Sequence, residues 1–385
     1  MKYILAFNLF IVSLFSYSQT YQIKKIVVDK NTQIPLENVL VFNETDNSTT
    51  NADGKFIFVS KKNEINLNLL GYEEVKTTYE GLKNTSDTIF MQIKTIQLQE
   101  VEVSNTSFYM QKVYNKIKDN VLLNYTAEFF LRNTLKKQNE NIVLQDIYGK
   151  KNQSTTNKKM TSIEILNMRK IKLSEKDNHI DFKFQDFNEF FSLNAPEVIK
   201  CNFTEIPFND TNLKKILFET KEKDQKGQIW KGYFIINRKD YAIIEIKIMS
   251  NNDFNEVSYK KGSTSRVQYR TVKWNKWMQF TKDKKSNKYY PSNLKMECRV
   301  EVVADKATFF YDNNIDYFVT NNPTTQKVNS NFSTDKDIFK AKFPYSKDFW
   351  DTQNQLPLTH ELELFLKSVN AKKDKTKEYE VIGNF

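Results

Sequence analysis

Residues 227–249 read GQIWKGYFIINRKDYAIIEIKIM, and this stretch decides the fold class. Two runs rich in β-branched and aromatic residues, 229–236 and 241–249, are separated by the polar segment 237–240. In the second run apolar side chains recur at every other position, which is the period of a strand with one buried face. These side chains are Ala242, Ile244, Ile246 and Ile248. The stretch therefore predicts a β-hairpin with its turn at 237–240.

The same pattern continues C-terminal to this hairpin. Segments 265–280, 288–303 and 307–320 each combine aromatic or β-branched residues with alternating polar ones. Pro291 is expected at the start of its strand, because proline cannot donate a hydrogen bond to a neighbouring strand. We expect a larger antiparallel β-sheet domain over residues 126–335, and a mainly β protein overall.

Residues 21–93 contain several short strand patterns separated by turn residues. Pro35, the pair Asp53-Gly54 and the pair Gly71-Tyr72 mark the turns. Asp-Gly between apolar runs is a strong hairpin signal, and Gly54 is expected to adopt a positive φ angle there. Phe56 and Tyr72 are expected in the core. Regular short strands at this spacing predict a small antiparallel β-sandwich.

This N-terminal run resembles the carboxypeptidase-like regulatory domain, a transthyretin-like (prealbumin-like) β-sandwich. The resemblance rests on three segments in the expected order: Pro35-Leu36-Glu37-Asn38-Val39, Thr50 to Phe56 with Asp53-Gly54, and Gly71-Tyr72. It departs in the first strand, where Lys24-Lys25 replace a position often held by glycine. The resemblance implies a structural module rather than a catalytic one, of a kind found in exported proteins of the Gram-negative cell envelope.

Residues 96–103 resemble the stretch that joins such a sandwich to the plug of TonB-dependent receptors. A receptor barrel has 22 strands and needs ~10 residues per strand plus loops, which exceeds the chain that remains. We therefore expect an envelope protein of this group without a TonB-dependent barrel.

The first residues have the pattern of a secretory signal peptide. Lys2 is followed by an apolar run from Ile4 to Phe15 and then by Ser16-Tyr17-Ser18, which suits a cleavage site before Gln19. A retained membrane anchor is the alternative interpretation. We expect the mature protein to be exported and to lie in the periplasm or at the outer membrane.

These signals divide the chain into consecutive parts. A helix is expected over 108–124, capped by Thr106 or Ser107, and a second one over 360–369, capped by Thr359. The expected parts are a signal peptide (1–18), a carboxypeptidase-regulatory-like β-sandwich (19–95), a linker with a helix (96–125), the antiparallel β domain (126–335) and a C-terminal segment with a helix (336–385).

Composition restricts the class of partner. The net charge is +11, but only six of the 58 basic residues are arginine. Arginine dominates bidentate recognition of bases and phosphates, so specific nucleic-acid binding is not expected. The expected partner is an envelope protein or a lipophilic ligand.

Two cysteines lie within predicted strands. If both segments are strands, Cys201 is expected to share a face with Ile199 and Phe203, and Cys298 to share one with Met296 and Val300. In an oxidising compartment the two could form a disulfide, and the alternative is two separate buried thiols.

Few residues suggest catalysis or metal binding. His360 and Glu363 match His-x-x-Glu, the first pair of ligands in zinc carboxypeptidases, but no third histidine follows, and His179 lies in a polar stretch. Asp53 could be a calcium ligand or could bond its own backbone. Asp181, Asp186 and Glu189 could form a carboxylate pair or lie on solvated strand edges.

We therefore assign no catalytic, cofactor or metal residue, and we expect a protein that is not an enzyme. The first hypothesis is an envelope interaction or scaffold protein. The alternatives are a carrier of a lipophilic ligand in the larger β domain and an unrecognised hydrolase.

Overall fold

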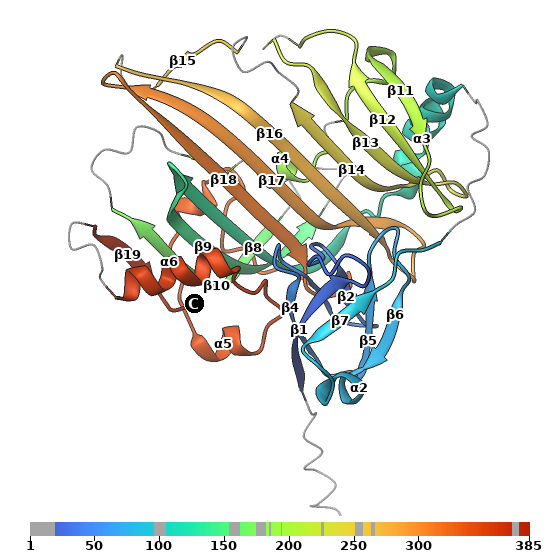
Figure 1. The fold of residues 1–385 in the computed structure, drawn as a ribbon, viewed down its shortest axis with the longest axis horizontal. Coiled ribbons are helices and arrows are strands. Elements are labelled where there is room, and N and C mark those ends of the chain that lie inside the picture. Colours follow the sequence, from blue (N-terminus) through green and yellow to red (C-terminus); the bar gives the residue numbers. More distant parts are fainter. Residues whose placement is uncertain are drawn as a thin grey trace, which may run out of the picture.

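The computed structural model describes residues 20–95, 105–153, 162–174, 182–184, 186–193, 195–224, 227–250, 257–262, 266–371 and 377–385. The predicted signal peptide and its cleavage site lie outside these ranges, as do the linker 96–104, His179 and Asp181. As predicted, the protein is mainly β, with small N-terminal sheets, a larger sheet and a C-terminal helix (Figure 1). Among the described helices, none has both the length and the apolar character needed to span a membrane.

The N-terminal part packs two small sheets around an apolar core. The first sheet has the strand order β4 (Lys55–Ser60), β1 (Tyr21–Asp29), β7 (Thr88–Met91). The second has the order β3 (Asn47–Thr49), β2 (Leu40–Phe42), β5 (Glu64–Asn68), β6 (Val75–Thr78), and α2 (Tyr79–Lys83) follows β6. All pairs are antiparallel except β1 with β7, which run parallel, so the predicted sandwich contains one parallel pair.

The turn at Gly54 has the conformation that the sequence predicts. Gly54 has a φ of +71°, and a Cβ atom placed on it would lie 2.4 Å from the carbonyl oxygen of Val27. The neighbouring Phe56 is 1% exposed, as expected for a core residue. Tyr72 packs only partly into the core, because its hydroxyl donates to Asp29 Oδ2 at 2.9 Å.

Replacing Gly54 with valine is therefore expected to be costly. A β-branched residue at positive φ is strained by about 1–3 kcal/mol, and the overlap with the Val27 carbonyl adds a packing cost of roughly 1–3 kcal/mol. Gly71→Val is the matched control, since Gly71 has a φ of +85° but nothing within 4 Å of its Cβ position. Urea unfolding should show a larger loss of unfolding free energy for Gly54→Val than for Gly71→Val. Equal losses in the two variants would contradict the close approach to Val27.

The larger part is one antiparallel sheet of 12 strands. Its strands lie side by side in the order β11 (Cys201–Ile206), β12 (Leu213–Thr220), β13 (Trp230–Asn237), β14 (Ile243–Ser250), β16 (Val267–Lys282), β17 (Tyr289–Ala304), β18 (Ala307–Val319), β8 (Tyr125–Lys137), β9 (Glu140–Gln153), β10 (Ser162–Leu173) and β19 (Tyr379–Ile382), and β15 (Lys260–Lys261) pairs with β16. The predicted hairpin is β13 with β14, and Pro291 lies near the start of β17, next to a bulge in the same strand. The meander prediction is thus confirmed.

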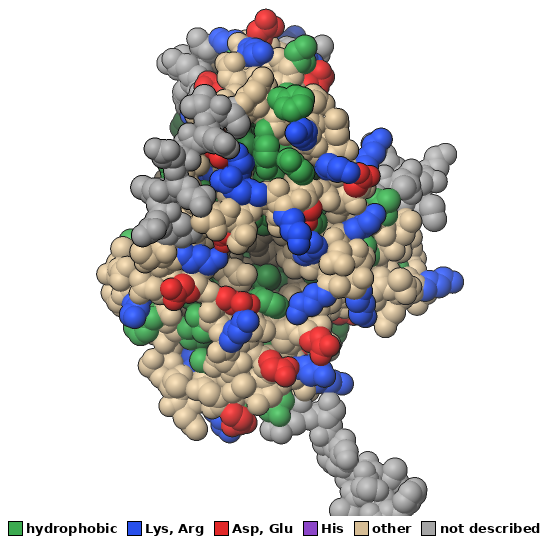
Figure 2. Space-filling model, turned by 90° about the vertical axis from the view of Figure 1, so that its right-hand side faces the viewer, with side chains coloured by type: hydrophobic (Ala, Val, Ile, Leu, Met, Phe, Trp, Pro, Cys, Tyr) green, Lys and Arg blue, Asp and Glu red, His purple; other side chains and the backbone are tan. Residues whose placement is uncertain are grey.

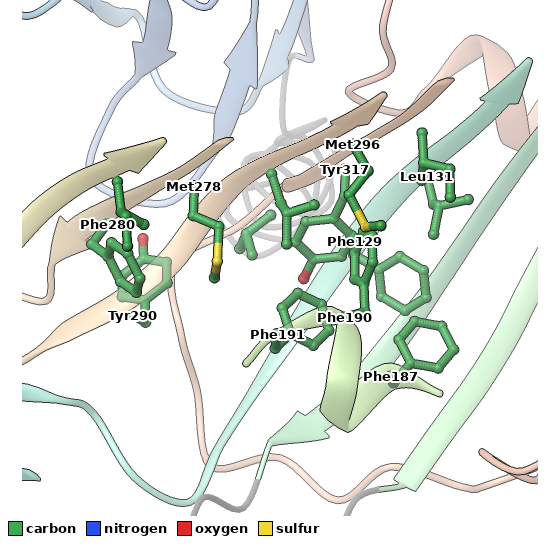
Figure 3. Close-up of a cluster of buried hydrophobic side chains, with 14 of the residues drawn as sticks. Phe129, Leu131, Phe187, Phe190, Phe191, Met278, Phe280, Tyr290, Met296 and Tyr317 are labelled. Carbon is green, nitrogen blue, oxygen red and sulfur yellow. The ribbon is translucent and has the colours of Figure 1, made fainter. Parts of the chain in front are cut away.

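One face of this sheet, here called the inner face, is filled with aromatic side chains. The short helix α4 (Phe187–Phe190) lies against it, and α3 (Thr106–Asn120) packs at its β11 end. Phe190 and Phe191 extend from α4 toward Tyr317, with ring centroids 5.9 and 4.9 Å from the tyrosine ring (Figure 3). The helix α3 begins two residues earlier than predicted, because Asn105 is its cap and accepts from Phe108 N.

The opposite, outer face is covered by two parts of the chain that are far apart in sequence. The N-terminal sheets lie against β16, β17 and β18, and the C-terminal segment covers β8, β9 and β10 (Figure 1). That segment contains a short 3-10 turn at Ile338–Lys340, α5 (Lys347–Asp351) and α6 (His360–Asn370), and a second 3-10 turn at Val198–Lys200 precedes β11. Thr359 caps α6 as predicted.

The two cysteines are separate free thiols, and burial raises the pKa of each to about 11. Cys201 begins β11 and Cys298 lies in β17, five strand positions away. At ~4.8 Å per strand step this separation is about 24 Å, far beyond the ~7 Å that a disulfide allows between Cα atoms. The alternative of a disulfide is therefore not what the structure contains.

Candidate functional site

The N-terminal sheets are attached to the C-terminal segment through the edge of β4. Asn354 is 6% exposed, and its side chain acts as an added residue of that edge. Its Oδ1 accepts from Val59 N at 2.7 Å, and its Nδ2 donates to Val59 O at 2.9 Å. A buried amide that pairs both backbone groups fixes the module against residues 354–359. The β4 edge is therefore occupied within the chain rather than open to a partner strand.

The residues that suggested metal chemistry take part in the same attachment. Asp53 Oδ2 accepts from the backbone N of His360 at 2.7 Å, and Lys55 Nζ lies 3.2 Å from Glu363 Oε1. The partner of the Asp53 carboxylate is thus the first turn of α6 rather than its own backbone. Among the residues that the structure describes, no group of three His, Cys, Asp or Glu side chains is placed to hold a metal ion.

The other candidate carboxylates also have structural surroundings. Asp186 caps α4 by accepting from Asn188 N and Glu189 N, so it lies at a helix start and not on a strand edge as predicted. Glu189 is exposed on the same turn. Asp181, the third residue of that hypothesis, falls outside the described ranges.

A buried charge cluster lies beneath the C-terminal segment. Asp146 is fully buried and accepts from Arg132 at 2.7 and 2.8 Å and from Arg169 at 2.7 and 3.0 Å. Burial acts to raise the pKa of Asp146, but the two guanidinium groups outweigh it and hold this pKa below its usual value. Arg132 also donates to the carbonyl oxygens of Leu356 and Pro357, so the cluster holds residues 354–359 onto the sheet.

Two linked hollows lie where the N-terminal sheets meet the outer face. The first, of about 380 Å³, is here called the outer hollow and lies over β12, β13, β14, β16 and β17. The second, of about 170 Å³, is called the junction chamber and is enclosed by the N-terminal sheets, the large sheet and the C-terminal segment. Figure 2 shows a hollow near the middle of this side of the molecule, with charged side chains of both signs around it. Both hollows share the lining residues Glu37, Asn38, Trp277, Lys295 and Glu297.

The outer hollow combines an acid with aromatic rings. Tyr233 donates its hydroxyl to Glu245 Oε1 at 2.7 Å. Burial raises the pKa of Glu245, although the hydrogen bonds from Trp277 and Tyr233 act in the opposite direction. Lys215 lies over the Tyr233 ring with its Nζ 4.5 Å from the centroid. Such a surface offers ring faces for packing together with a hydrogen-bonding carboxyl group.

An ion pair between the two parts of the protein separates the hollows. Lys295 Nζ lies 2.5 Å from Glu37 Oε1, so a side chain of the sheet contacts a turn of the N-terminal sheets. Burial acts to lower the pKa of Lys295, but the carboxylates of Asp316 and Glu37 outweigh it and raise this pKa. The pair lies at the boundary of the two hollows, whose walls come from both parts of the chain, and the two hollows together are here called the groove.

Comparison of the sequence with protein-family models gives no match, and comparison with curated proteins gives none either. The interpretation of the groove therefore rests on its geometry.

Analysis of the sequence alone did not identify the groove residues. Three of these residues lie on the outer face of the sheet: Trp277, Lys295 and Asp316. In a strand with one apolar face, side chains on the opposite face are typically exposed to solvent. The one available signal was Trp277, because a tryptophan at a polar position between Lys276 and Met278 is unusual for a solvated face.

Proposed function

We propose that this chain is a non-enzymatic, exported protein of the Gram-negative cell envelope that binds a ligand or partner in the groove between its N-terminal module and its large sheet. The module is proposed to be a carboxypeptidase-regulatory-like sandwich that serves as a wall of the binding site. The observation that carries this proposal is the shared lining of the two hollows by Glu37 and Asn38 from the module and Trp277, Lys295 and Glu297 from the sheet.

The filling of the inner face supports a ligand on the outer face rather than one inside the sheet. Phe187, Phe190 and Phe191 are all at most 8% exposed and pack against Phe129 and Tyr317. A carrier of a lipophilic ligand usually holds it in a largely apolar cavity. Here the described apolar side chains of the inner face pack against one another, so the outer groove is the better candidate.

Site-specific photo-cross-linking in cells tests this proposal. A benzoylphenylalanine at position 277 keeps an aromatic group in the groove, and the same residue at Ile199, which is 77% exposed and does not line the groove, is the control. We expect a discrete cross-linked product from position 277 in the envelope fraction that position 199 does not give. Identical products from both positions, or none from position 277, would contradict the proposal.

A further inference from the structure

We propose that the junction chamber binds an ammonium or guanidinium group of the ligand, with the Asp316 carboxylate as its counter-ion. This inference rests on the proposed function, since it names the chemistry that one part of the groove recognises. The chamber is lined by the N-terminal segment 49–52, the strands β8, β17 and β18, and residues of the C-terminal segment.

The acceptor groups of the chamber are open. Asp316 is half-buried near the C-terminal end of β18. Within the described chain its carboxylate has no hydrogen bond and no ion pair within 4 Å, and Lys295 and Arg132 act on it only from a greater distance. Thr49 is 6% exposed, and its Oγ1 is buried with no hydrogen-bond partner among the described residues. Buried polar atoms are normally paired, so an open carboxylate and an unpaired hydroxyl in the lining of one chamber favour a ligand that donates several hydrogen bonds.

The cationic side chains around the chamber are already paired. Arg132 uses its donors on Asp146, Leu356 O and Pro357 O. Lys136 is paired with Glu361 at 2.7 Å, and Lys295 is paired with Glu37 at 2.5 Å. Because Glu37 and Lys295 also line the outer hollow, this pair lies on the side from which a ligand in that hollow would reach the chamber.

Charge and size agree with a small cation. Burial and the nearby carboxylates Glu37 and Glu297 raise the pKa of Asp316, against the opposing effect of Lys295 and Arg132. A bound cation would relieve this repulsion. The volume of about 170 Å³ corresponds to roughly five or six water molecules at ~30 Å³ each, which suits the end of a lysine or arginine side chain or a small free amine.

Calorimetric titration of the full mature chain at pH 7 tests the inference. The probes are n-butylammonium, n-butylguanidinium, the neutral n-butanol and the blocked peptide acetyl-Gly-Lys-Gly-amide. We expect the cations to bind at least tenfold more tightly than n-butanol. Tighter binding of the peptide than of n-butylammonium would identify a polypeptide side chain as the source of the cation, and the reverse order would identify a free amine.

Variants connect the binding to named atoms. Asp316→Asn keeps the shape of the side chain and should weaken cation binding at least tenfold, while Thr49→Val should weaken it several-fold. Asp312→Asn is the matched control, because Asp312 lies four pairs along the same strand, outside the chamber, and should leave binding unchanged. The fold of Asp316→Asn is expected to persist, because burial already disfavours the charged carboxylate.

Two outcomes would overturn the inference. One is equal binding of n-butanol and the cations, or no measurable binding of any cation to the wild-type chain. The other is unchanged cation binding in Asp316→Asn. If cross-links from position 277 persist in either case, the groove remains the binding surface and only its cation chemistry is wrong. Absence of cross-links from position 277 would instead contradict the proposed function.

Discussion

Asp146→Asn is expected to destabilise the protein by about 3–5 kcal/mol, because it leaves two buried guanidinium groups without their counter-ion. Asp146 is 0% exposed, Arg132 is 1% exposed and Arg169 is 6% exposed. The cost of an uncompensated buried charge greatly exceeds that of a broken pair at the surface. An asparagine side chain has one acceptor oxygen where the carboxylate has two, so it can accept only some of the hydrogen bonds that the two arginines donate.

The expected loss also includes the attachment of residues 354–359. Arg132 donates to Leu356 O and Pro357 O, and Arg169 Nη2 donates to Gln355 Oε1 at 2.7 Å. Once Asp146 is neutral, the two arginines repel each other and their positions are no longer fixed. Because Asn354 joins the same segment to Val59, the disturbance should extend to the N-terminal sheets.

Urea unfolding followed by circular dichroism measures this effect. The control is Asp351→Asn, which removes the exposed i,i+4 pair with Lys347 and should cost less than about 0.5 kcal/mol. A change of similar size in the two variants would mean that the cluster is solvated and not a buried charge triad.

The strands of the large sheet were predictable, because their patterns are local. The hairpin of β13 and β14 follows from the alternation of Ile244, Ile246 and Ile248 and the polar turn at 237–240. The start of α3 was placed wrongly, since Asn105, a residue in the predicted linker, supplies the cap. The strand β19 has only four residues, and a run this short carries too little periodicity to be predicted from sequence.

The groove was not predictable from the sequence, because it depends on long-range pairing. The strand β18 pairs with β8, whose residues precede it by about 180 positions, and this pairing places Asp316 beside Arg132. The N-terminal module then covers the same face, which brings Glu37 to Lys295. No local pattern contains these contacts. Asp186 shows the opposite case. Its position near other acidic residues suggested a functional carboxylate, but in the structure it caps the start of α4.

Lys151 has the least favourable surroundings of the described charged residues and gives the second large expected effect. It is 0% exposed, and its Nζ lies 3.1 Å from the centroid of the Phe191 ring and 5.1 Å from that of Tyr317. Among the residues that the structure describes, its Nζ has one hydrogen bond, to Gln153 Oε1 at 3.5 Å. Burial lowers the pKa of Lys151 well below its usual value and so disfavours the charged form of the amine.

Lys151→Met is therefore expected to stabilise the protein by about 1–4 kcal/mol, because an apolar side chain of similar length replaces a buried ionisable group. The matched control is Lys276→Met. Lys276 is 1% exposed, but its Nζ donates to Ser192 O at 2.6 Å and to Glu189 O at 3.4 Å. Removing this donor breaks the bonds to the two carbonyl oxygens and should cost about 1–3 kcal/mol. The two substitutions are thus expected to have opposite signs.

The pH dependence of stability separates this explanation from a general packing effect. A lysine whose pKa is lowered on folding binds fewer protons in the folded state than in the unfolded state, so stability rises with pH between the two pKa values. Lys276 has a pKa lowered to about 8, so it adds to the rise of stability with pH in both the wild type and Lys151→Met. Its contribution therefore cancels when the two stability curves are subtracted. The buried tyrosines have raised pKa values, so the protein loses their contribution to its stability only as the pH rises above about 10. As the pH rises toward about 10.4, the pKa of an unfolded lysine, the wild type should therefore gain more stability than Lys151→Met. Parallel curves would show that the folded protein keeps Lys151 charged.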